Sequence, residues 1–192
     1  ESAELHELAR AQPDAVEIVH CDVTDPASVA AIKDSCAEGS VDLLVMNAGV
    51  YGGSEQELDQ LGRENVADIV MTNAVAPAQA ALELLPLVKR GGTVAMMSSK
   101  MGSIDDSSGG VNLYRLSKVS QNMLARSLFA KHAQPRGVGV VSLHPGWVQT
   151  DMGGPNALID VQTSVDGMLE VVDRDDGQSH RFIAYDGSEV PW

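Results

Sequence analysis

The sequence of 192 residues contains few cysteines and no long apolar run. Its two cysteines, Cys21 and Cys36, form neither a C-x-x-C pair nor a cluster with the five histidines, so no zinc site is predicted. They also provide no disulfide framework, and we therefore expect reduced thiols in a cytoplasmic protein. Because no apolar run approaches the ~18 residues needed to cross a bilayer, we expect a soluble protein.

Basic residues are also scarce. The sequence has 13 Lys and Arg against 27 Asp and Glu, which gives a formal net charge of −14 at pH 7. This charge repels both phosphate backbones and anionic lipid surfaces. We therefore predict neither nucleic acid nor a membrane as a partner, and we interpret the acidic excess as a surface that favours solubility.

Short apolar runs bounded by turn residues alternate with longer segments of helical period, which is typical of β-α units and a parallel sheet. We predict strands over Val16–His20, Val41–Met46, Thr93–Ser98, Val138–Leu143 and Arg181–Tyr185. We predict helices over Ser2–Ala11, Pro26–Cys36, Gly62–Val88, Asn112–His132 and Asn156–Val172. The length suits a single domain over residues 1–192, with an α/β fold and a doubly wound parallel sheet.

Tyr114 and Lys118 are the strongest candidates for a catalytic pair. They are four positions apart near the start of a predicted helix, so their side chains share one helical face. A nearby ammonium favours the phenolate, which predicts a Tyr114 pKa below its usual value near ~10. Such a phenol can exchange a proton with an alcohol or a carbonyl. At this spacing alone, however, a surface pair is the commoner interpretation.

Ser98 and Ser99 follow the apolar part of a predicted strand, and ligands of parallel sheets bind beyond the carboxyl ends of strands. A glycine- and serine-rich loop then leads to Tyr114. A hydroxyl at this strand end can hold a substrate oxygen beside the phenol. Without Tyr114, a polar strand terminus would be the preferred interpretation.

Two further candidates are the segment Asn47-Ala48-Gly49, directly after a predicted strand, and Asn73, inside a predicted helix. The small residues of the first segment permit close approach of a planar ligand, although an ordinary turn has the same composition.

The second candidate, Asn73, lies in an apolar stretch, and asparagine is a mediocre helix former. It is either a satisfied core amide or a residue that interrupts the helix to order a water near Lys118.

Taken in order, these residues resemble the motifs of the short-chain dehydrogenase/reductase family, over essentially the whole sequence. The resemblance implies a Rossmann-like fold and NAD or NADP as the cofactor. It implies a catalytic tetrad of Asn73, Ser99, Tyr114 and Lys118. It implies cofactor contacts from Asp22, Val23, Asn47, Ala48, Gly49, Tyr114, Lys118, Pro145, Gly146, Val148 and Thr150. The stretches SSKMGSI, GGVNLYRLSK and FIAYDGSEVPW resemble the C-factor-like group of carbonyl-reductase-like members.

The spacing of the serine differs slightly from the family pattern. Ser99 precedes Tyr114 by fifteen positions, which is longer than the family's commonest separation. Ser98 and Ser103 therefore remain alternatives for the serine role, and we assign Ser99.

A larger departure concerns the family's glycine-rich T-G-x-x-x-G-x-G turn, which seats the cofactor pyrophosphate and does not occur in this sequence. Residues 1 to 12 resemble the helix before the family's third strand, so the N-terminal β-α-β portion is missing from this chain. In the family's strand order 3-2-1-4-5-6-7, this separates Val16–His20 from its neighbours and exposes the edge of Val41–Met46. We expect about forty more residues before Glu1. A chain starting there should bind nicotinamide cofactors poorly and should not fold as a plain monomer.

The sequence therefore predicts hydride transfer between a nicotinamide cofactor and a small-molecule carbonyl or secondary alcohol. In this interpretation Tyr114 is the general acid/base, Lys118 lowers its pKa and holds the ribose, Ser99 positions the substrate oxygen, and Asn73 anchors a proton-relay water. We expect a homodimer or homotetramer formed through the two longest predicted helices. The alternative is a truncated, cofactor-free fragment with an association or signalling role. The missing phosphate loop favours this alternative, and the intact tetrad opposes it.

Overall fold

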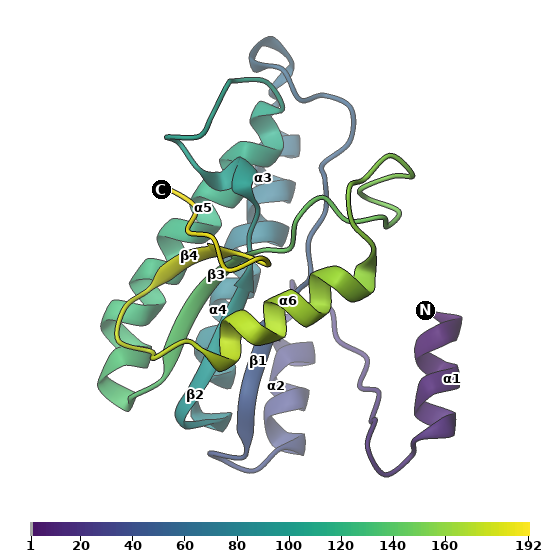
Figure 1. Ribbon diagram of the computed structural model, residues 1–192, viewed down its shortest axis with the longest axis vertical. Coiled ribbons are helices and arrows are strands. Elements are labelled where there is room, and N and C mark those ends of the chain that lie inside the picture. Colours follow the sequence, from purple (N-terminus) through teal and green to yellow (C-terminus); the bar gives the residue numbers. More distant parts are fainter. Residues whose placement is uncertain (1) are drawn as a thin grey trace.

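The computed structural model describes residues 2–192, which form a parallel β-sheet with helices on both faces (Figure 1). Its strands, in the order in which they pair, are β1 (Val41–Met46), β2 (Val88–Met97), β3 (Gly139–His144) and β4 (Arg181–Ala184). Each strand is parallel to its neighbour. The predicted α/β fold with a parallel sheet is confirmed, and four of the five predicted strands are present.

The described chain contains six α-helices: α1 (Ala3–Ala11), α2 (Pro26–Ser35), α3 (Arg63–Val70), α4 (Ala76–Leu84), α5 (Asn112–Leu128) and α6 (Val161–Asp173). The described chain also contains two π turns, η2 (Met71–Val75) and η5 (Phe129–Ala133). Short 3-10 turns are η1 (Leu58–Gln60), η3 (Leu85–Leu87), η4 (Lys100–Gly102) and η6 (Gln134–Arg136). No helix within residues 2–192 is long and apolar enough to span a membrane.

The two faces of the sheet bury different sets of side chains. Val94, Met96 and Val140 belong to the core cluster that includes buried residues of α2, α4 and α5. Val141 and Leu143 point to the other face, where they pack with Val171 of α6. Figure 1 shows α6 crossing one face of the sheet, with α4 and α5 behind it. Burial on both faces explains why β3 is almost continuously apolar.

The predicted strand Val16–His20 does not form. In the described chain this segment has no paired neighbour, and Ile18 and Val19 are exposed. A strand requires a second backbone to complete its hydrogen bonds, so an apolar, β-branched run is not sufficient. Consistent with this, α1 and the segment that follows it extend away from the sheet in Figure 1. The outer edge of β1 is unpaired in residues 2–192, as the sequence predicted.

The five predicted helices contain the six observed α-helices, with changes at their ends and interruptions by π and 3-10 turns. The helix predicted over Gly62–Val88 consists of α3, the π turn η2, α4 and the 3-10 turn η3. The helix predicted to begin at Asn156 begins instead at Val161. The reason is a cap, because the Asp160 carboxylate accepts a hydrogen bond from the Thr163 backbone N–H at 2.7 Å.

Candidate active site

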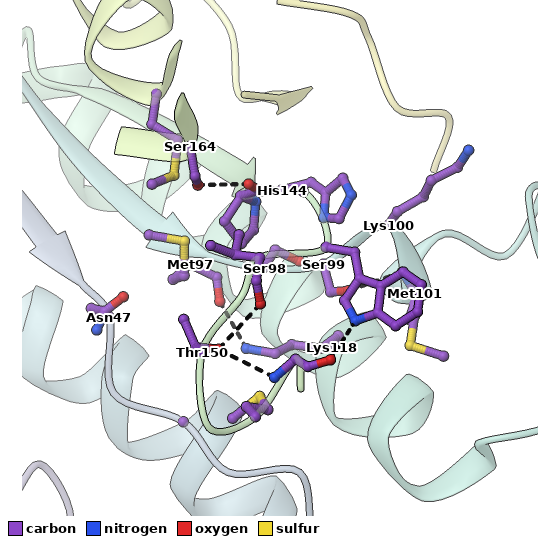
Figure 2. Close-up of a pocket in the computed structure, with 18 of the residues that line it drawn as sticks. Asn47, Met97, Ser98, Ser99, Lys100, Met101, Lys118, His144, Thr150 and Ser164 are labelled. Atoms are coloured by element: carbon purple, nitrogen blue, oxygen red, sulfur yellow. Dashed lines mark hydrogen bonds between the residues drawn. The ribbon is translucent and has the colours of Figure 1, made fainter. Parts of the chain in front are cut away.

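The carboxyl ends of β1, β2 and β3 open onto a pocket of about 930 Å³. Figure 2 shows residues from these three strand ends facing it, including Asn47 after β1, Met97 to Ser99 at the end of β2, and His144 at the end of β3. Lys118 reaches the same pocket from α5. Side chains predicted from separate parts of the sequence therefore line one cavity.

Tyr114 and Lys118 lie one turn apart on α5, and the Lys118 Nζ is 5.6 Å from the centroid of the Tyr114 ring. Lys118 is 4% exposed. Its ammonium donates to the Met97 carbonyl at 2.7 Å and to the Gln121 Oε1 at 3.2 Å. An ammonium carries three N–H donors, so these two bonds fix the group and leave one N–H for the pocket side.

Burial determines the titration of both groups. It lowers the pKa of Lys118 from its usual 10.5 to about 8, because desolvation disfavours the charged form. It raises the pKa of Tyr114 for the same reason, while a hydrogen bond with Ser99 acts in the opposite direction. The lower Tyr114 pKa expected from the neighbouring ammonium is therefore wrong for this structure. Desolvation of the phenol is the largest effect on its pKa, and it exceeds the opposing effect of the Ser99 hydrogen bond.

The three candidate serines have different surroundings. Ser99 lines the pocket and is hydrogen-bonded to the Tyr114 phenol. The Ser98 hydroxyl is buried and donates to the Asn122 Oδ1 at 2.7 Å. The buried Ser103 hydroxyl accepts from a backbone N–H of its own loop. Among these serines, the geometry places Ser99 next to the phenol.

Asn73 lies inside the π turn η2 and is fully buried. Its amide pairs with the backbone of Val50, accepting from the N–H at 2.7 Å and donating to the carbonyl at 2.8 Å. It also donates to the Ser117 hydroxyl at 2.9 Å. Both interpretations of this residue therefore hold in part, since Asn73 is a satisfied buried amide and the helix departs from α geometry around it. π turns of this kind often accompany functional sites.

Of the residues expected to contact a cofactor, most line the pocket: Asn47, Gly49, Tyr114, Lys118, Pro145, Gly146, Val148 and Thr150. The others lie elsewhere. Ala48 is exposed beside the pocket lining, and Val23 packs against the core. The exposed Asp22 carboxylate accepts hydrogen bonds from the backbone and hydroxyl of Thr24, which lower its pKa.

The residues present fit a nicotinamide cofactor at Gly49. A Cβ atom there would lie 3.3 Å from the Asn73 Oδ1 and 3.6 Å from the Lys118 Nζ, so glycine keeps open the space beside the ammonium. The segment from Pro145 that lines the same pocket is held by α6, because the Ser164 hydroxyl donates to the Pro145 carbonyl at 2.6 Å.

The sequence did not reveal several other residues of the site. Four methionines line the pocket: Met97, Met101, Met152 and Met168. His144 also lines it, and burial, reinforced by the Lys100 charge, lowers its pKa to about 4, so its ring is neutral near pH 7. The position of His144 directly before Pro145 was a usable signal, whereas nothing local distinguished the methionines from core residues.

Buried amides around α5 were also missed. Gln121 holds the Lys118 ammonium, and its Nε2 has no hydrogen-bond partner among residues 2–192. Asn122 accepts from Ser98 and donates to the Gly102 carbonyl at 3.3 Å. A Cβ at Gly102 would lie 3.0 Å from atoms of Asn122 and Lys118, so this glycine allows η4 to approach α5 closely. Gln56 bonds to the first turn of α5.

Comparison with known proteins places these features in context. A family model described as enoyl-(acyl carrier protein) reductase matches residues 1–167. The chain is 41% identical over 169 residues to C-signal of Myxococcus xanthus, covering 84% of this chain and 99% of that protein. A carbonyl reductase from Pseudomonas aeruginosa PAO1 in complex with NADP is 34% identical with a TM-score of 0.88, covering 100% of this chain and 84% of that one. The NADPH-bound carbonyl reductase from chicken fatty liver is 31% identical with a TM-score of 0.88, and the match covers 98% of this chain and 82% of that one.

Proposed function

Because the chain belongs to the short-chain dehydrogenase/reductase family of oxidoreductases, which use NAD(P), we propose that it interconverts a carbonyl and a secondary alcohol. One observation carries this proposal. The Tyr114 phenol, hydrogen-bonded to Ser99 and close to the Lys118 ammonium, lies in the wall of a pocket of about 930 Å³. This arrangement offers a proton donor and a hydroxyl to the same oxygen atom of a substrate.

The direction of the Tyr114 pKa shift supports the role of an acid. A phenol with a raised pKa is protonated near pH 7, so Tyr114 can donate its proton to the substrate oxygen as a carbonyl becomes an alcohol. Ser99 then holds that oxygen through its hydroxyl. Lys118 is predominantly protonated at pH 7, since its pKa is about 8, and its charge stabilises the phenolate that remains after proton transfer.

The bound cofactor would supply the hydride to the carbonyl carbon. The residues suited to hold it are those that line the pocket at the strand ends, including Asn47, Gly49 and the segment from Pro145 to Thr150. The remaining N–H of Lys118 suits a ribose hydroxyl. Asn73 as the anchor of a relay water stays a prediction, and its backbone carbonyl would be the group involved because its side chain is bonded to Val50 and Ser117.

The rest of the lining supports a substrate with a large apolar part. Trp147, Val165 and the methionines Met101, Met152 and Met168 contribute to it. Methionine side chains are flexible and polarisable, and they adapt to ligands of irregular shape. A cytoplasmic location is part of the same proposal, because both cysteines are free and exposed thiols in the described chain.

A second candidate function is a non-catalytic role in association or signalling. The 41% identity with the protein named C-signal favours it. Such a role requires neither a buried ammonium nor a serine beside the phenol. Cofactor binding and turnover distinguish the two candidates.

The proposal is tested by titration with NADPH and NADH, followed by turnover of apolar aldehydes and ketones. Both the chain and a form that also carries a glycine-rich β-α-β segment at its amino end should be measured, because such a segment can seat the cofactor pyrophosphate. Tyr114→Phe should abolish carbonyl reduction in the active form while the circular dichroism spectrum is unchanged. Near-normal turnover of Tyr114→Phe would remove Tyr114 from the mechanism, and failure of both forms to bind either cofactor would favour the non-catalytic role.

A further inference from the structure

The helix that carries Tyr114 and Lys118 starts at an aliphatic residue. The N-cap position of α5 is Val111, in a left-handed conformation with φ of 50°. The first N–H groups of a helix have no acceptor within the helix, and a Ser, Thr, Asp or Asn at the N-cap usually provides one. The acceptors for the first turn of α5 must therefore come from another part of the chain.

Gln56, in the loop between β1 and α3, provides these acceptors. Its side-chain Oε1 accepts from the Tyr114 backbone N–H at 3.0 Å, and its backbone carbonyl accepts from the Asn112 N–H at 2.8 Å. Gln56 precedes Tyr114 by 58 positions and is only 7% exposed. A single loop residue thus caps two positions at the start of α5.

The same amide also orders its own loop. Its Nε2 donates to the carbonyls of Tyr51 and Gly53, both at 3.0 Å. The ring of Tyr51 lies beside that of Tyr114, with 5.4 Å between centroids. Both N–H donors and an acceptor position of the amide are therefore in use. A buried amide with these bonds resists displacement, because each broken bond leaves a polar group without a partner.

We propose that Gln56 is a positioning residue for Tyr114, which sets the start of α5 and holds Tyr51 against the Tyr114 ring. This inference rests on the proposed function, in which the location of the phenol matters for proton transfer. Gln56 is absent from the described residues that line the pocket, so it acts through Tyr114 and not by contact with substrate. A misplacement of reacting groups by about 1 Å can lower turnover about 10²-fold.

Three variants separate the contributions of this amide. Gln56→Met keeps the length of the side chain and removes both the acceptor and the donors. Gln56→Glu keeps an acceptor for the Tyr114 N–H but replaces the donors to Tyr51 and Gly53 by an oxygen. Gln60→Met is the matched control, because Gln60 is an exposed neighbour whose Oε1 accepts from the Glu57 N–H in its own turn.

Hydrogen exchange of the Tyr114 amide, followed by NMR on the full chain, measures the cap directly. We expect Gln56→Met to accelerate this exchange at least tenfold relative to amides in the middle of α5. Gln56→Glu should leave the Tyr114 amide protected but weaken the nuclear Overhauser effects between the rings of Tyr51 and Tyr114. Gln60→Met should change neither. Equal exchange and equal ring contacts in all variants would overturn the inference, and if Gln56→Met does not fold, the ring contacts of Gln56→Glu decide it.

Turnover then tests the consequence for catalysis. In the cofactor-binding form, we expect Gln56→Met to lower kcat at least tenfold with KM for carbonyl and NADPH within twofold, and Gln56→Glu to lie between it and the wild type. Unchanged kcat in both variants would overturn the positioning role. If the wild type reduces no carbonyl at all, the proposed function fails, while the exchange and ring-contact measurements still decide whether Gln56 holds Tyr114.

Discussion

We expect burial of the Lys118 ammonium to make the stability of the protein depend on pH above neutrality. The pKa of Lys118 is about 8 in the folded chain and 10.5 for an exposed lysine, and burial is the cause. Below pH 8 the buried Lys118 ammonium is charged in the folded state, so its desolvation destabilises the folded state to the full extent. Between pH 8 and 10.5 the folded state has lost this proton and the unfolded state has kept it, so stability rises with pH.

The size of the effect follows from the difference between the two pKa values. Each pKa unit corresponds to about 1.4 kcal/mol, so the change from 10.5 to about 8 destabilises the folded protein by about 3 kcal/mol at pH 7. Most of this cost disappears by pH 10. In Lys118→Met the charge is absent, and the hydrogen bonds to Met97 and Gln121 are lost at every pH. The difference in free energy of unfolding between wild type and Lys118→Met should therefore shift by about 3 kcal/mol in favour of the wild type as pH rises.

Urea unfolding at several pH values from 7 to 10 measures this difference. Taking the difference between the two proteins removes the contributions of the groups that they share. Lys131→Met is the control, since it removes the same kind of side chain from an exposed position, where no ammonium is buried. A difference between wild type and Lys118→Met that is flat across this range would refute the reasoning, because it would mean that folding does not desolvate the ammonium.

Two further predictions concern the serines and the assembly. Ser99→Ala should lower kcat at least tenfold and lower stability by about 1 kcal/mol, because its hydroxyl caps η4 by accepting from the Met101 N–H. Ser98→Ala should lower stability by about 1–3 kcal/mol, because it leaves the buried Asn122 Oδ1 without a donor. A tenfold loss of kcat in Ser98→Ala and not in Ser99→Ala would assign the serine role to Ser98. Pairing of copies through α4 and α5, which carry the exposed apolar residues Leu82, Leu116 and Met123, predicts at least a dimer. A monomeric mass by light scattering at micromolar concentration would contradict it.

Strands β1 and β3 were predictable because their sequences are rich in apolar residues. The runs at Val41–Met46 and Val138–Leu143 are apolar at successive positions, and helices cover β3 on both faces. The run at Val16–His20 has a similar composition but does not form a strand, because pairing depends on a second backbone and not on the run itself. Sequence patterns indicate which segments suit a sheet, but they do not state which neighbour each segment has.

The sequence predicted which residues form the site, but it did not predict how deeply each of them is buried. Tyr114, Lys118 and Ser99 lie together as expected. The pKa of the phenol nevertheless shifts upward, because the side chain is buried. The sequence shows the neighbouring charge of Lys118 but not the degree of burial. The role of Gln56 left no local signal, since its acceptor and the N–H that it caps are 58 positions apart. Contacts of this length emerge only when the fold brings the β1–α3 loop to the start of α5.

The π turn at Met71–Val75 has a consequence for the length of its helix. The Ala76 N–H bonds to the Met71 carbonyl, five positions back, so this turn contains one residue more than a turn of α-helix. Removing one residue from η2 would give an uninterrupted α-helix with α3 and α4 still presenting the same faces to the core. A deletion within α4 would instead rotate the residues beyond it by about 100° and turn its buried alanines outward. A single-residue deletion within η2, at a position other than the buried Asn73, should therefore disturb the fold less than a deletion a few positions later in α4.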